Sequence, residues 1–334
     1  MILEYLRLIN FRCHHDFELR LTQNTTRIIG KNGCGKTSVI EAIYEALQGK
    51  SFRAVDREII QREKNFYRIE LGFNDGRKTV VTYDGAKKEF LTSDKKSRRL
   101  PPKSRYPIVL FEPDDLHLIG SSPTSRRNYF DHMFGQFSDA YSVALNRYIK
   151  ALKQRNELLK QENVSPGELF SWDVMLGSYG VKIANYRREY IERINHDFTK
   201  VYRSIAENQD QIKMKYQSEI STESDFLDRL NHNYRIDSLV GHTSFGIHRD
   251  DFNFIFNGVG ADGSASRGEV RSGILALKFI EADLILEILN HKPVILLDDV
   301  FSELDQTRQK CLIRNFQDNQ VIMTSVGDGV MEIM

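Results

Sequence analysis

The stretch RIIGKNGCGKTSVIEAIYEALQG, residues 27–49, constrains the fold of this chain more than any other feature. It satisfies the pattern G-x-x-x-x-G-K-[S/T], in which the backbone of a glycine-rich loop wraps a phosphate group. The β-branched pair Ile28 and Ile29 predicts a strand before the loop, and apolar residues recur after it at helical spacing as far as Gly49. A strand, a phosphate-binding loop and a helix in this order predict an α/β fold.

The residue types of this loop suit the binding of ATP. Glycines let backbone N–H groups turn toward an anion, and the helix that follows directs its positive end at the same point. Lys36 is expected to contact the β- and γ-phosphates, and the Thr37 hydroxyl is expected to ligate Mg²⁺. A chance glycine-rich turn is the alternative, and the two flanking elements argue against it. The predicted ATP-binding residues here are Gly30, Lys31, Asn32, Gly33, Cys34, Gly35, Lys36, Thr37 and Ser38.

The stretch HKPVILLDDVFSELD supplies a partner for the loop. Val294–Leu297 is a short apolar run typical of a buried parallel strand, and acids follow at its carboxyl end, the sheet edge where ligands bind. We expect Asp298 to hold Mg²⁺ through water and Asp299 to orient or deprotonate an attacking water. Two acids after a strand are more often a solvated turn, but the upstream P-loop favours a site. A second run, QVIMTS, predicts the next strand, with Thr324 and Ser325 at the same edge.

A serine, a glycine and a glutamate stand just before the apolar run GILALKFIEADLILEIL. Ser266 is expected to cap a helix that begins near Glu269, and the N–H groups at such a helix end form a second anion site. An ordinary cap explains these residues when they are taken alone. However, the order of P-loop, S-x-G-[Q/E], apolar strand with aspartate, and S-x-L-D resembles the ABC-type ATPases. That resemblance implies that Ser266, Gly268 and Glu269 contact the γ-phosphate of a nucleotide held by the opposite subunit.

Further motifs resemble the RecF family of bacterial DNA replication and repair proteins over nearly the whole chain. The start of the chain, LRLINFRCHHDFEL, is similar to the N-terminal strand pair of that family, and the resemblance places Arg12 near the nucleotide. The other matching segments are LQGKSFRA, FEPDDLHLIGSSPTSRRNYFD, LNRYIKALKQRNELL and FGIHRDDF.

The chain departs from the family pattern at a few positions. Ile247 stands where the family usually has proline, which predicts a looser turn, and Glu269 replaces the more usual glutamine. The stretch VLFEPDDL has no glutamine, so a Q-loop metal ligand cannot be assigned. The switch histidine usual in ABC ATPases is absent, with Ser325 near its place, as in the RecF family.

The resemblance implies an ATP-dependent DNA-binding protein of recombinational repair and replication restart. Binding of ATP and Mg²⁺ would drive homodimerisation on duplex or gapped DNA, and slow hydrolysis through Lys36, Asp298 and Asp299 would reopen the dimer. An aspartate is one methylene shorter than the glutamate usual in transporters, so we expect a weak, DNA-stimulated ATPase. The family implies RecO and RecR as partners, loading of RecA as the outcome, and a bacterial cytoplasmic location.

Two helical stripes lie between the nucleotide motifs. From about Ser138 apolar positions recur at helical spacing, and the stretch NVSPGE breaks the pattern at Pro166 and Gly167. A second stripe runs from Tyr179 to Ile194. These stripes are more typical of internal packing than of a partner site.

The long stretch of sequence between Lys36 and Ser266 determines the predicted architecture. ABC-type motifs share one head, so the chain between them must leave the head and return. We predict a P-loop ABC-type ATPase head, a mixed sheet flanked by helices, formed by residues 1–133 and 240–334. Residues 134–239 form an inserted arm of short antiparallel helices.

The segment KKSRRLPPKSR, residues 95–105, is a candidate DNA contact because it carries many cations and no acid. Such a cluster can neutralise several phosphates, although a charge run is also typical of a solvated loop. With 47 basic and 46 acidic residues, DNA binding requires a local patch of this kind. Arg126 and Arg127 are a second candidate, or else serve packing of the head. The candidate residues of the segment are Lys95, Lys96, Arg98, Arg99, Lys103 and Arg105.

The remaining composition indicates a reduced, soluble, intracellular protein. Cys13, Cys34 and Cys311 lie far apart in sequence without a CxxC pair, which argues against a structural zinc site or a disulfide framework. The N-terminus does not resemble a secretion signal, and no uncharged run approaches the roughly 20 residues that span a bilayer.

Three alternatives to the switch function remain. A transport ATPase subunit would have fewer residues between the P-loop and the S-x-G-[Q/E] segment, which is called the signature loop. It would also have a switch histidine and no arm. A structural clamp would use nucleotide only to fix a dimer, without hydrolysis. A small-molecule kinase would share only the P-loop and would leave SRGEVRS unexplained.

Overall fold

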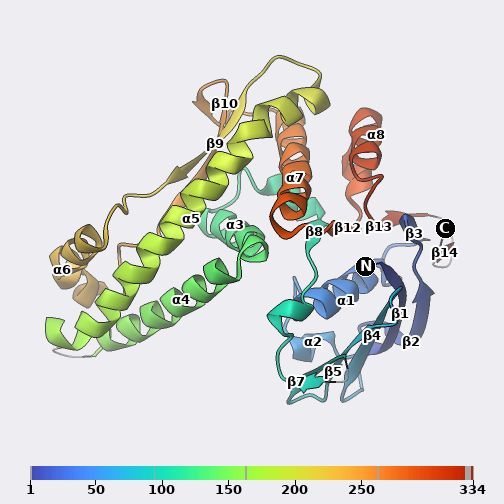
Figure 1. The fold of residues 1–334 in the computed structure, drawn as a ribbon, viewed down its shortest axis with the longest axis horizontal. Helices are drawn as coiled ribbons and strands as arrows, with labels where there is room; N and C mark the ends of the chain where they lie inside the picture. Colours follow the sequence, from blue (N-terminus) through green and yellow to red (C-terminus); the bar gives the residue numbers. More distant parts are fainter. Residues whose placement is uncertain (1, 94, 162–163, 262, 328–331, 334) are drawn as a thin grey trace. The chain divides into compact units, whose positions relative to one another are not determined.

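The computed structural model describes residues 2–93, 95–161, 164–261, 263–327 and 332–333 (Figure 1). The chain divides into two compact units. One, the terminal unit, combines Met1–Leu116 with Glu281–Met334, and the other, the central unit, is His117–Ile280. The predicted assignment of head and arm divides the chain at other residues, after 133 and after 239, and stays a prediction. The predicted boundaries were placed where helical periodicity starts and ends in the sequence. The boundaries of the two compact units also depend on contacts between residues that are distant in sequence.

An antiparallel sheet in the terminal unit has the strand order β2-β1-β4-β5-β6-β7. β1 alternates buried with more exposed residues, as a strand does when one face lies on a core. Its inward Leu6 and Leu8 lie opposite Leu71 and Ile69 of β4, and β1 with β2 confirms the predicted N-terminal strand pair. The strands are β1 (Leu3–Phe11), β2 (His14–Arg20), β4 (Tyr67–Phe73), β5 (Lys78–Tyr83), β6 (Lys88–Thr92) and β7 (Lys95–Ser97).

A second sheet of the terminal unit has the order β14-β3-β13-β12-β8. All its neighbours run parallel except β14, so the sheet is mixed, as predicted. Parallel strands end at the same edge, which therefore carries the segments after Gly30, Phe111 and Leu297. The strands are β3 (Thr25–Gly30), β8 (Ile108–Phe111), β12 (Val294–Leu297), β13 (Val321–Val326) and β14 (Glu332–Ile333), which confirms those predicted before the P-loop, at 294–297 and in QVIMTS.

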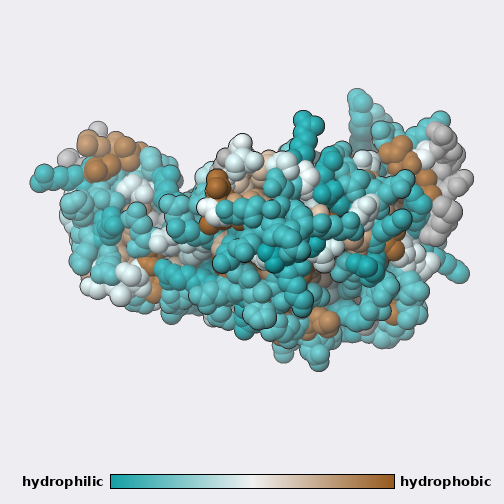
Figure 2. Space-filling model, turned by 90° about the horizontal axis from the view of Figure 1, so that it is seen from above, coloured by the Kyte–Doolittle hydropathy of each residue, from teal (hydrophilic) through white to brown (hydrophobic). Residues whose placement is uncertain are grey.

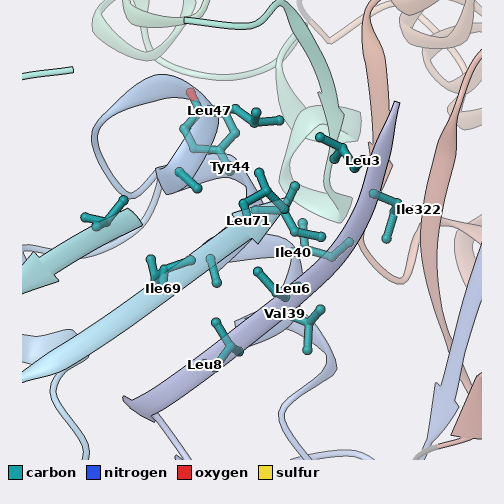
Figure 3. Packing of buried hydrophobic residues seen from close by; sticks show 14 of the residues in the cluster. Leu3, Leu6, Leu8, Val39, Ile40, Tyr44, Leu47, Ile69, Leu71 and Ile322 are labelled. Carbon is teal, nitrogen blue, oxygen red and sulfur yellow. The ribbon is translucent and has the colours of Figure 1, made fainter. Parts of the chain in front are cut away.

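Helix α1 (Lys36–Gln48) lies in the core of the terminal unit and joins the two sheets. Figure 3 shows Val39 and Ile40 of α1 beside Leu6 of β1, and Ile322 of β13 belongs to the same apolar cluster. Burial of each such aliphatic side chain contributes roughly 1.5–3 kcal/mol, so the core holds the helix firmly in place. The other helices of this unit are α2 (Asp56–Ile59) and α8 (Gln306–Asn315), besides the end of α7.

The central unit consists of helices packed around a small antiparallel sheet in the order β11-β10-β9. Figure 1 shows α4 lying along α5, and α7 begins in this unit and ends in the terminal unit. The elements are α3 (Pro123–Phe137), α4 (Asp139–Leu159), α5 (Pro166–Ala206), β9 (Ile212–Gln217), α6 (Glu223–Val240), β10 (Asp251–Phe256), β11 (Val259–Gly260) and α7 (Arg267–Leu289).

The two predicted helical runs correspond to α4 and α5. Ser138 caps α4, and Tyr148 of its stripe is fully buried, in agreement with internal packing. The break predicted at Pro166 and Gly167 is wrong by a few residues, because α4 ends at Leu159 and Pro166 is the first residue of α5. At that position the missing N–H of proline has no helical partner to lose. α5 has 41 residues, longer than the short helices expected.

Two buried arginines hold the central unit together. Arg155 pairs with Asp173 at 2.6 Å and with Asp237 at 2.7 Å, which ties α4 to α5 and α6. Arg187 of α5 pairs with Asp131 of α3 at 2.7 Å. Since a buried charge is costly without a partner, these pairs specify how the helices pack.

The surface is mostly hydrophilic on the face drawn in Figure 2. The figure also shows apolar side chains gathered at the end that carries α6, where Ile236, Leu239 and Val240 are exposed. Among the described residues, no helix has both the length and the apolarity that crossing a membrane requires.

Candidate nucleotide site

The P-loop joins β3 to α1 and takes a shape that depends on glycine. Gly33 and Gly35 have φ of 81° and 100°, in the left-handed region that favours glycine. A Cβ added at Gly35 would lie 2.4 Å from Cys13 Sγ and 2.5 Å from His14 Nε2, whereas one at Gly33 would meet no atom of the described residues within 4 Å. The second glycine is therefore required both for conformation and for space.

The start of α1 is open to an anion. Gly35 occupies the N-cap position, and among the described residues no side chain caps this helix end. Its first turn carries no acid, so the positive end of the helix dipole is not neutralised there. Lys36 is buried, and its Nζ donates to the carbonyl oxygens of Gly30 at 2.9 Å and Lys31 at 3.0 Å. These bonds hold the ammonium group inside the curve of the loop.

Thr37 and Asp298, the two predicted Mg²⁺ ligands, are in direct contact. Thr37 Oγ1 donates to Asp298 Oδ1 at 3.0 Å, and Thr324 Oγ1 donates to the same oxygen at 2.9 Å. The backbone N–H of Asp298 donates to the carbonyl of Phe111 at 2.9 Å, which fixes the end of β12 against β8. Burial raises the pKa of Asp298, and the bonds from Thr324 and Thr37 only partly offset this effect.

Asp299 follows in a strained backbone conformation, with φ of 51°. Its N–H donates to Thr324 Oγ1 at 2.9 Å, so Thr324 orients both acids at once. Its carboxylate oxygen Oδ1 is buried and has no hydrogen-bond partner among the described residues. A buried oxygen of this kind is costly, and such oxygens are common where a ligand or water completes the site.

Arg12 is held against the P-loop helix rather than pointing freely into solvent. Its guanidinium bonds both oxygens of Glu41 on α1, at 2.9 and 2.7 Å, and Glu41 also accepts from Ser51 at 2.6 Å and Arg53 at 3.1 Å. Burial would raise the pKa of Glu41, but the bonds from Arg12 and Ser51 and the two positive charges lower it. Two cations therefore share one buried carboxylate beside the phosphate-binding loop.

The signature residues Ser266, Gly268 and Glu269 lie in the central unit, whereas the P-loop lies in the terminal unit. Glu269 N donates to Ser266 Oγ at 3.2 Å, and Ser266 N donates to Glu269 Oε2 at 2.6 Å. This reciprocal pattern is a capping box, and it confirms the predicted cap at the start of α7. Glutamine could make the same reciprocal bond, so glutamate at this position leaves the cap intact.

The six basic residues predicted to contact DNA lie on one edge of the antiparallel sheet and just beyond it. β7 is the last strand of the order, and Lys95 and Lys96 lie on it. Leu100, in the middle of the segment, is buried in the core of the terminal unit and anchors it. All six cations are exposed, and none forms an ion pair with another described residue; they are Lys95, Lys96, Arg98, Arg99, Lys103 and Arg105.

Arg126 and Arg127 serve packing. Arg126 is buried and makes a bidentate pair with Asp251 of β10, at 2.9 and 2.7 Å. Arg127 donates to the backbone carbonyl of Asp250 at 2.7 Å. Of the two alternatives for these residues, packing is the one that the contacts favour.

The FGIHRDDF segment is a structural junction within the central unit. His248 Nδ1 lies 2.9 Å from Tyr148 Oη, and burial lowers the pKa of His248 to about 4. A Cβ at Gly246 would lie 2.2 Å from the same tyrosine oxygen, so the glycine is needed for this approach. Ile247, which stands in place of proline, is buried, and its carbonyl accepts from Arg187 at 2.9 Å. These bonds hold the turn in place without the proline.

Sequence reasoning missed the residues that position the site rather than contact it. Glu41 and Arg53 lie in segments that were recognised, but no pattern indicated that they pair with each other. His14 is a second case: its Nε2 lies 3.1 Å from the carbonyl of Gly35, which supports the P-loop from the β1–β2 turn. Such contacts join residues distant in sequence, and only charge conservation or a known fold could have indicated them.

Comparisons with known proteins agree with this geometry. Residues 1–243 match the protein family described as AAA ATPase domain. The chain is 33% identical, over 98% of its length and 93% of the relative, to the DNA replication and repair protein RecF of Clostridium perfringens (strain SM101 / Type A). RecF of Clostridium beijerinckii is also 33% identical, with 98% and 92% covered.

Solved structures show the same likeness. A structure of the recombination mediator protein RecF-ATP in the RecFOR pathway has a TM-score of 0.89 at 26% identity, covering 99% of this chain and 94% of that one. The Smc head bound to the C-winged helix domain of ScpA has a TM-score of 0.54 at 15% identity, with 99% and 91% covered. The second likeness concerns the fold alone.

Proposed function

Because this chain belongs to the RecF family of DNA replication and repair proteins and carries an ATPase domain, we propose that it is an ATP-dependent switch for binding DNA. The P-loop of one copy takes ATP with Mg²⁺, and the signature loop of a second copy closes over it. The closed dimer holds duplex or gapped DNA, and slow hydrolysis reopens it. The observation that carries this proposal is the contact of Thr37 with Asp298 at the open start of α1.

The phosphate-binding part of the proposal follows from the loop itself. The backbone N–H groups of residues 31–38 surround the phosphates, since Gly33 and Gly35 turn the chain into a cradle. The β1–β2 turn packs so closely against Gly35 that a Cβ there would collide with Cys13 and His14. Lys36 already lies inside the loop, held by two carbonyls, and its ammonium group is the one proposed to contact the β- and γ-phosphates. Arg12 adds positive charge from the β1–β2 turn. The neighbouring solved structure RecF-ATP supports ATP as the nucleotide.

The donor set beside the loop fits Mg²⁺, because a hydroxyl and a carboxylate are hard oxygen ligands. Thr37 would ligate the ion directly and Asp298 through water, and both oxygens are already within hydrogen-bond distance of each other. When bound, Mg²⁺ neutralises charge on the phosphate oxygens during transfer. The raised pKa of Asp298 fits a carboxylate that awaits a cation, since ionising it without one is unfavourable.

Asp299 is the proposed general base. Its unpartnered, buried Oδ1 is available to accept a proton from the attacking water, while Thr324 fixes its backbone. The side chain of aspartate is one methylene shorter than that of glutamate, so its carboxylate lies farther from the attacking water. We therefore expect slow, DNA-stimulated hydrolysis of ATP. Slow turnover suits a timing switch better than force generation.

The closing surface is proposed to be the signature loop of the second copy. Ser266 and Glu269 cap α7 reciprocally, so this helix end is folded and positioned before any nucleotide arrives. Ser266 is exposed, and from the second copy it, with Gly268, would meet the γ-phosphate. Neither copy alone then encloses the nucleotide, which makes ATP the link between them.

DNA is proposed to lie along the basic edge of the antiparallel sheet. Its six exposed cations have no described ion-pair partner and can each neutralise a phosphate, which predicts binding that is independent of sequence and sensitive to salt. Family membership extends the proposal to RecO and RecR as partners and to RecA loading at gaps, in the bacterial cytoplasm. The RecFOR pathway of the neighbouring RecF structure supports this assignment.

Light scattering tests the proposal most directly. With ATP and Mg²⁺ the protein should double in mass, and without nucleotide it should be monomeric. Ser266→Arg should bind ATP and stay monomeric, because the added side chain blocks the closing surface but not the P-loop.

Ser264→Arg is the matched control, since Ser264 is also exposed and lies two residues earlier in the same loop. It should dimerise like the natural protein. A natural protein that stays monomeric when saturated with ATP would end the proposal. Equal absence of phosphate release from the natural protein and from Asp299→Asn would instead identify a structural clamp.

A further inference from the structure

Two of the three cysteines of this chain meet at the P-loop. Cys13 lies in the turn between β1 and β2, and its Sγ is 3.8 Å from the carbonyl oxygen of Cys34. The Cβ that Gly35 lacks would lie 2.4 Å from the same sulfur. The Cys13 thiol therefore lies against the peptide unit of the P-loop that joins Cys34 to Gly35.

Both thiols are within reach of a small oxidant. Cys13 is exposed and Cys34 is half-buried, whereas Cys311 on α8 is buried. Partial burial of its sulfur raises the pKa of Cys13. Cys34 lies directly before the first residues of α1, and we take it as the sulfur that meets the oxidant first.

We propose that Cys13 and Cys34 are a peroxide-sensitive thiol pair whose disulfide closes the P-loop to nucleotide. The inference rests on the proposed function to the extent that this loop binds ATP. Hydrogen peroxide first oxidises the Cys34 thiol to a sulfenic acid and is itself reduced to water. The Cys13 sulfur then loses its proton and attacks the sulfenic sulfur; the S–O bond breaks, and the leaving oxygen takes up a proton and departs as water. In total, two thiols and one peroxide give one disulfide and two waters.

The disulfide interferes with the cradle because its geometry is demanding. The bond needs Cα atoms roughly 4.4–6.8 Å apart and a narrow torsion, so it ties Cys34 to the β1–β2 turn. The cradle in turn needs Gly33 and Gly35 on either side of Cys34 to keep their left-handed conformations. We expect a loop tethered in this way to lose the left-handed conformations that the cradle needs. A bound triphosphate covers the loop and should slow oxidation, and a dithiol should reverse it.

Peptide mapping under non-reducing conditions, combined with ATP titration, tests the pair in the full-length protein. After peroxide, the natural protein should yield a linked Cys13–Cys34 peptide, less of it when ATP and Mg²⁺ are present. Its affinity for ATP should fall about tenfold or more, in proportion to the fraction of loop still able to form the cradle, and dithiothreitol should restore it. Cys311→Ser, the matched control, should behave like the natural protein.

Cys13→Ser should bind ATP normally when reduced, give no linked peptide after peroxide, and lose less affinity than the natural protein, since Cys34 alone cannot tether the loop. Absence of the linked peptide from the natural protein overturns the inference, as does a linked protein that binds ATP unchanged. If the reduced protein does not bind ATP, the proposed function fails instead, and the linked peptide still decides whether the pair exists.

Discussion

The two helices that begin at the nucleotide motifs start in opposite ways. α1 starts at Gly35 in a left-handed conformation, without a side-chain cap among the described residues and without an acid in its first turn. α7 starts at Ser266 with a complete capping box, and Glu269 lies in its first turn. Both starts follow small residues in the sequence, yet among the described residues only the start of α7 is capped by side chains.

The start of α1 is stabilised by residues from other segments, whereas the start of α7 is stabilised by its own side chains. The start of α7 is satisfied by its own side chains, so it folds without help. The start of α1 depends on distant residues, among them Arg12, His14 and Asp298. Substitutions around α1 should therefore change stability in either direction by more than the loss of the Glu269 charge at the start of α7, and the following changes examine this in order of expected size.

Glu41→Gln should have the largest effect on stability. The buried carboxylate of Glu41 pairs with both Arg12 and Arg53, and losing the anion of a buried ion pair leaves uncompensated charge. We expect a loss of about 3 kcal/mol in the free energy of unfolding, since both arginines retain some access to water. Urea unfolding measures it.

Asp16→Asn is the control for Glu41→Gln. Asp16 pairs with Arg7 at 3.0 Å on the surface, where an exposed pair contributes only about 0–1 kcal/mol. Equal losses from the two substitutions would contradict the view that burial around α1 makes the difference.

Gly35→Ala should come next, with a loss of about 2 kcal/mol from left-handed strain and crowding together. At φ of 100° the new Cβ meets Cys13 and the packed ring of His14. Gly33→Ala imposes similar strain, at φ of 81°, in open space, so it should cost about 1 kcal/mol. Thermal unfolding of the two variants isolates the contribution of crowding. A larger loss at Gly33 would refute the packing argument.

Asp298→Asn should stabilise the nucleotide-free protein, by about 1 kcal/mol at neutral pH, while abolishing hydrolysis. The pKa of Asp298 is raised above its ordinary 3.8 by burial, so its ionised form destabilises the fold. The free energy of unfolding of the natural protein should therefore equal that of the variant in acid. It should fall below that of the variant as the pH rises through the raised pKa of Asp298. Unfolding curves across pH follow this difference. A variant less stable than the natural protein at neutral pH would show that the charge is already compensated.

The sequence was sufficient for the parts of the fold that depend on local patterns. The strands at Val294–Leu297 and Val321–Val326, helix α1 to Gly49 and the cap at Ser266 all follow from periodicity, glycine and capping chemistry. The break was placed at Pro166 because a proline can interrupt a helix, but a proline can also be the first residue of one, as Pro166 is in α5.

The site was predictable only where a motif names its residues. Thr37 and Asp298 could be paired from the family pattern, and the structure places them in contact. Glu41, by contrast, is an acid on a helix face, and its role depends on arginines brought from two other segments. The pairing of Cys13 with Cys34 was likewise invisible, because sequence distance argued against it and only the packing of the β1–β2 turn on the P-loop brings them together.

Glu269→Gln should have the smallest effect on stability, and it tests the start of α7, which is capped by its own side chains. Glutamine can still accept from Ser266 N, so the capping box survives, and only the favourable charge at the helix start is lost. We expect a decrease of about 0.3–0.5 kcal/mol in the free energy of unfolding, measured in urea at low salt and diminishing at high salt. Ser266→Ala removes the cap itself and should cost about 1 kcal/mol. If Glu269→Gln matched that loss, the charge rather than the hydrogen bond would hold the start of α7, and this helix would depend on electrostatics as α1 does.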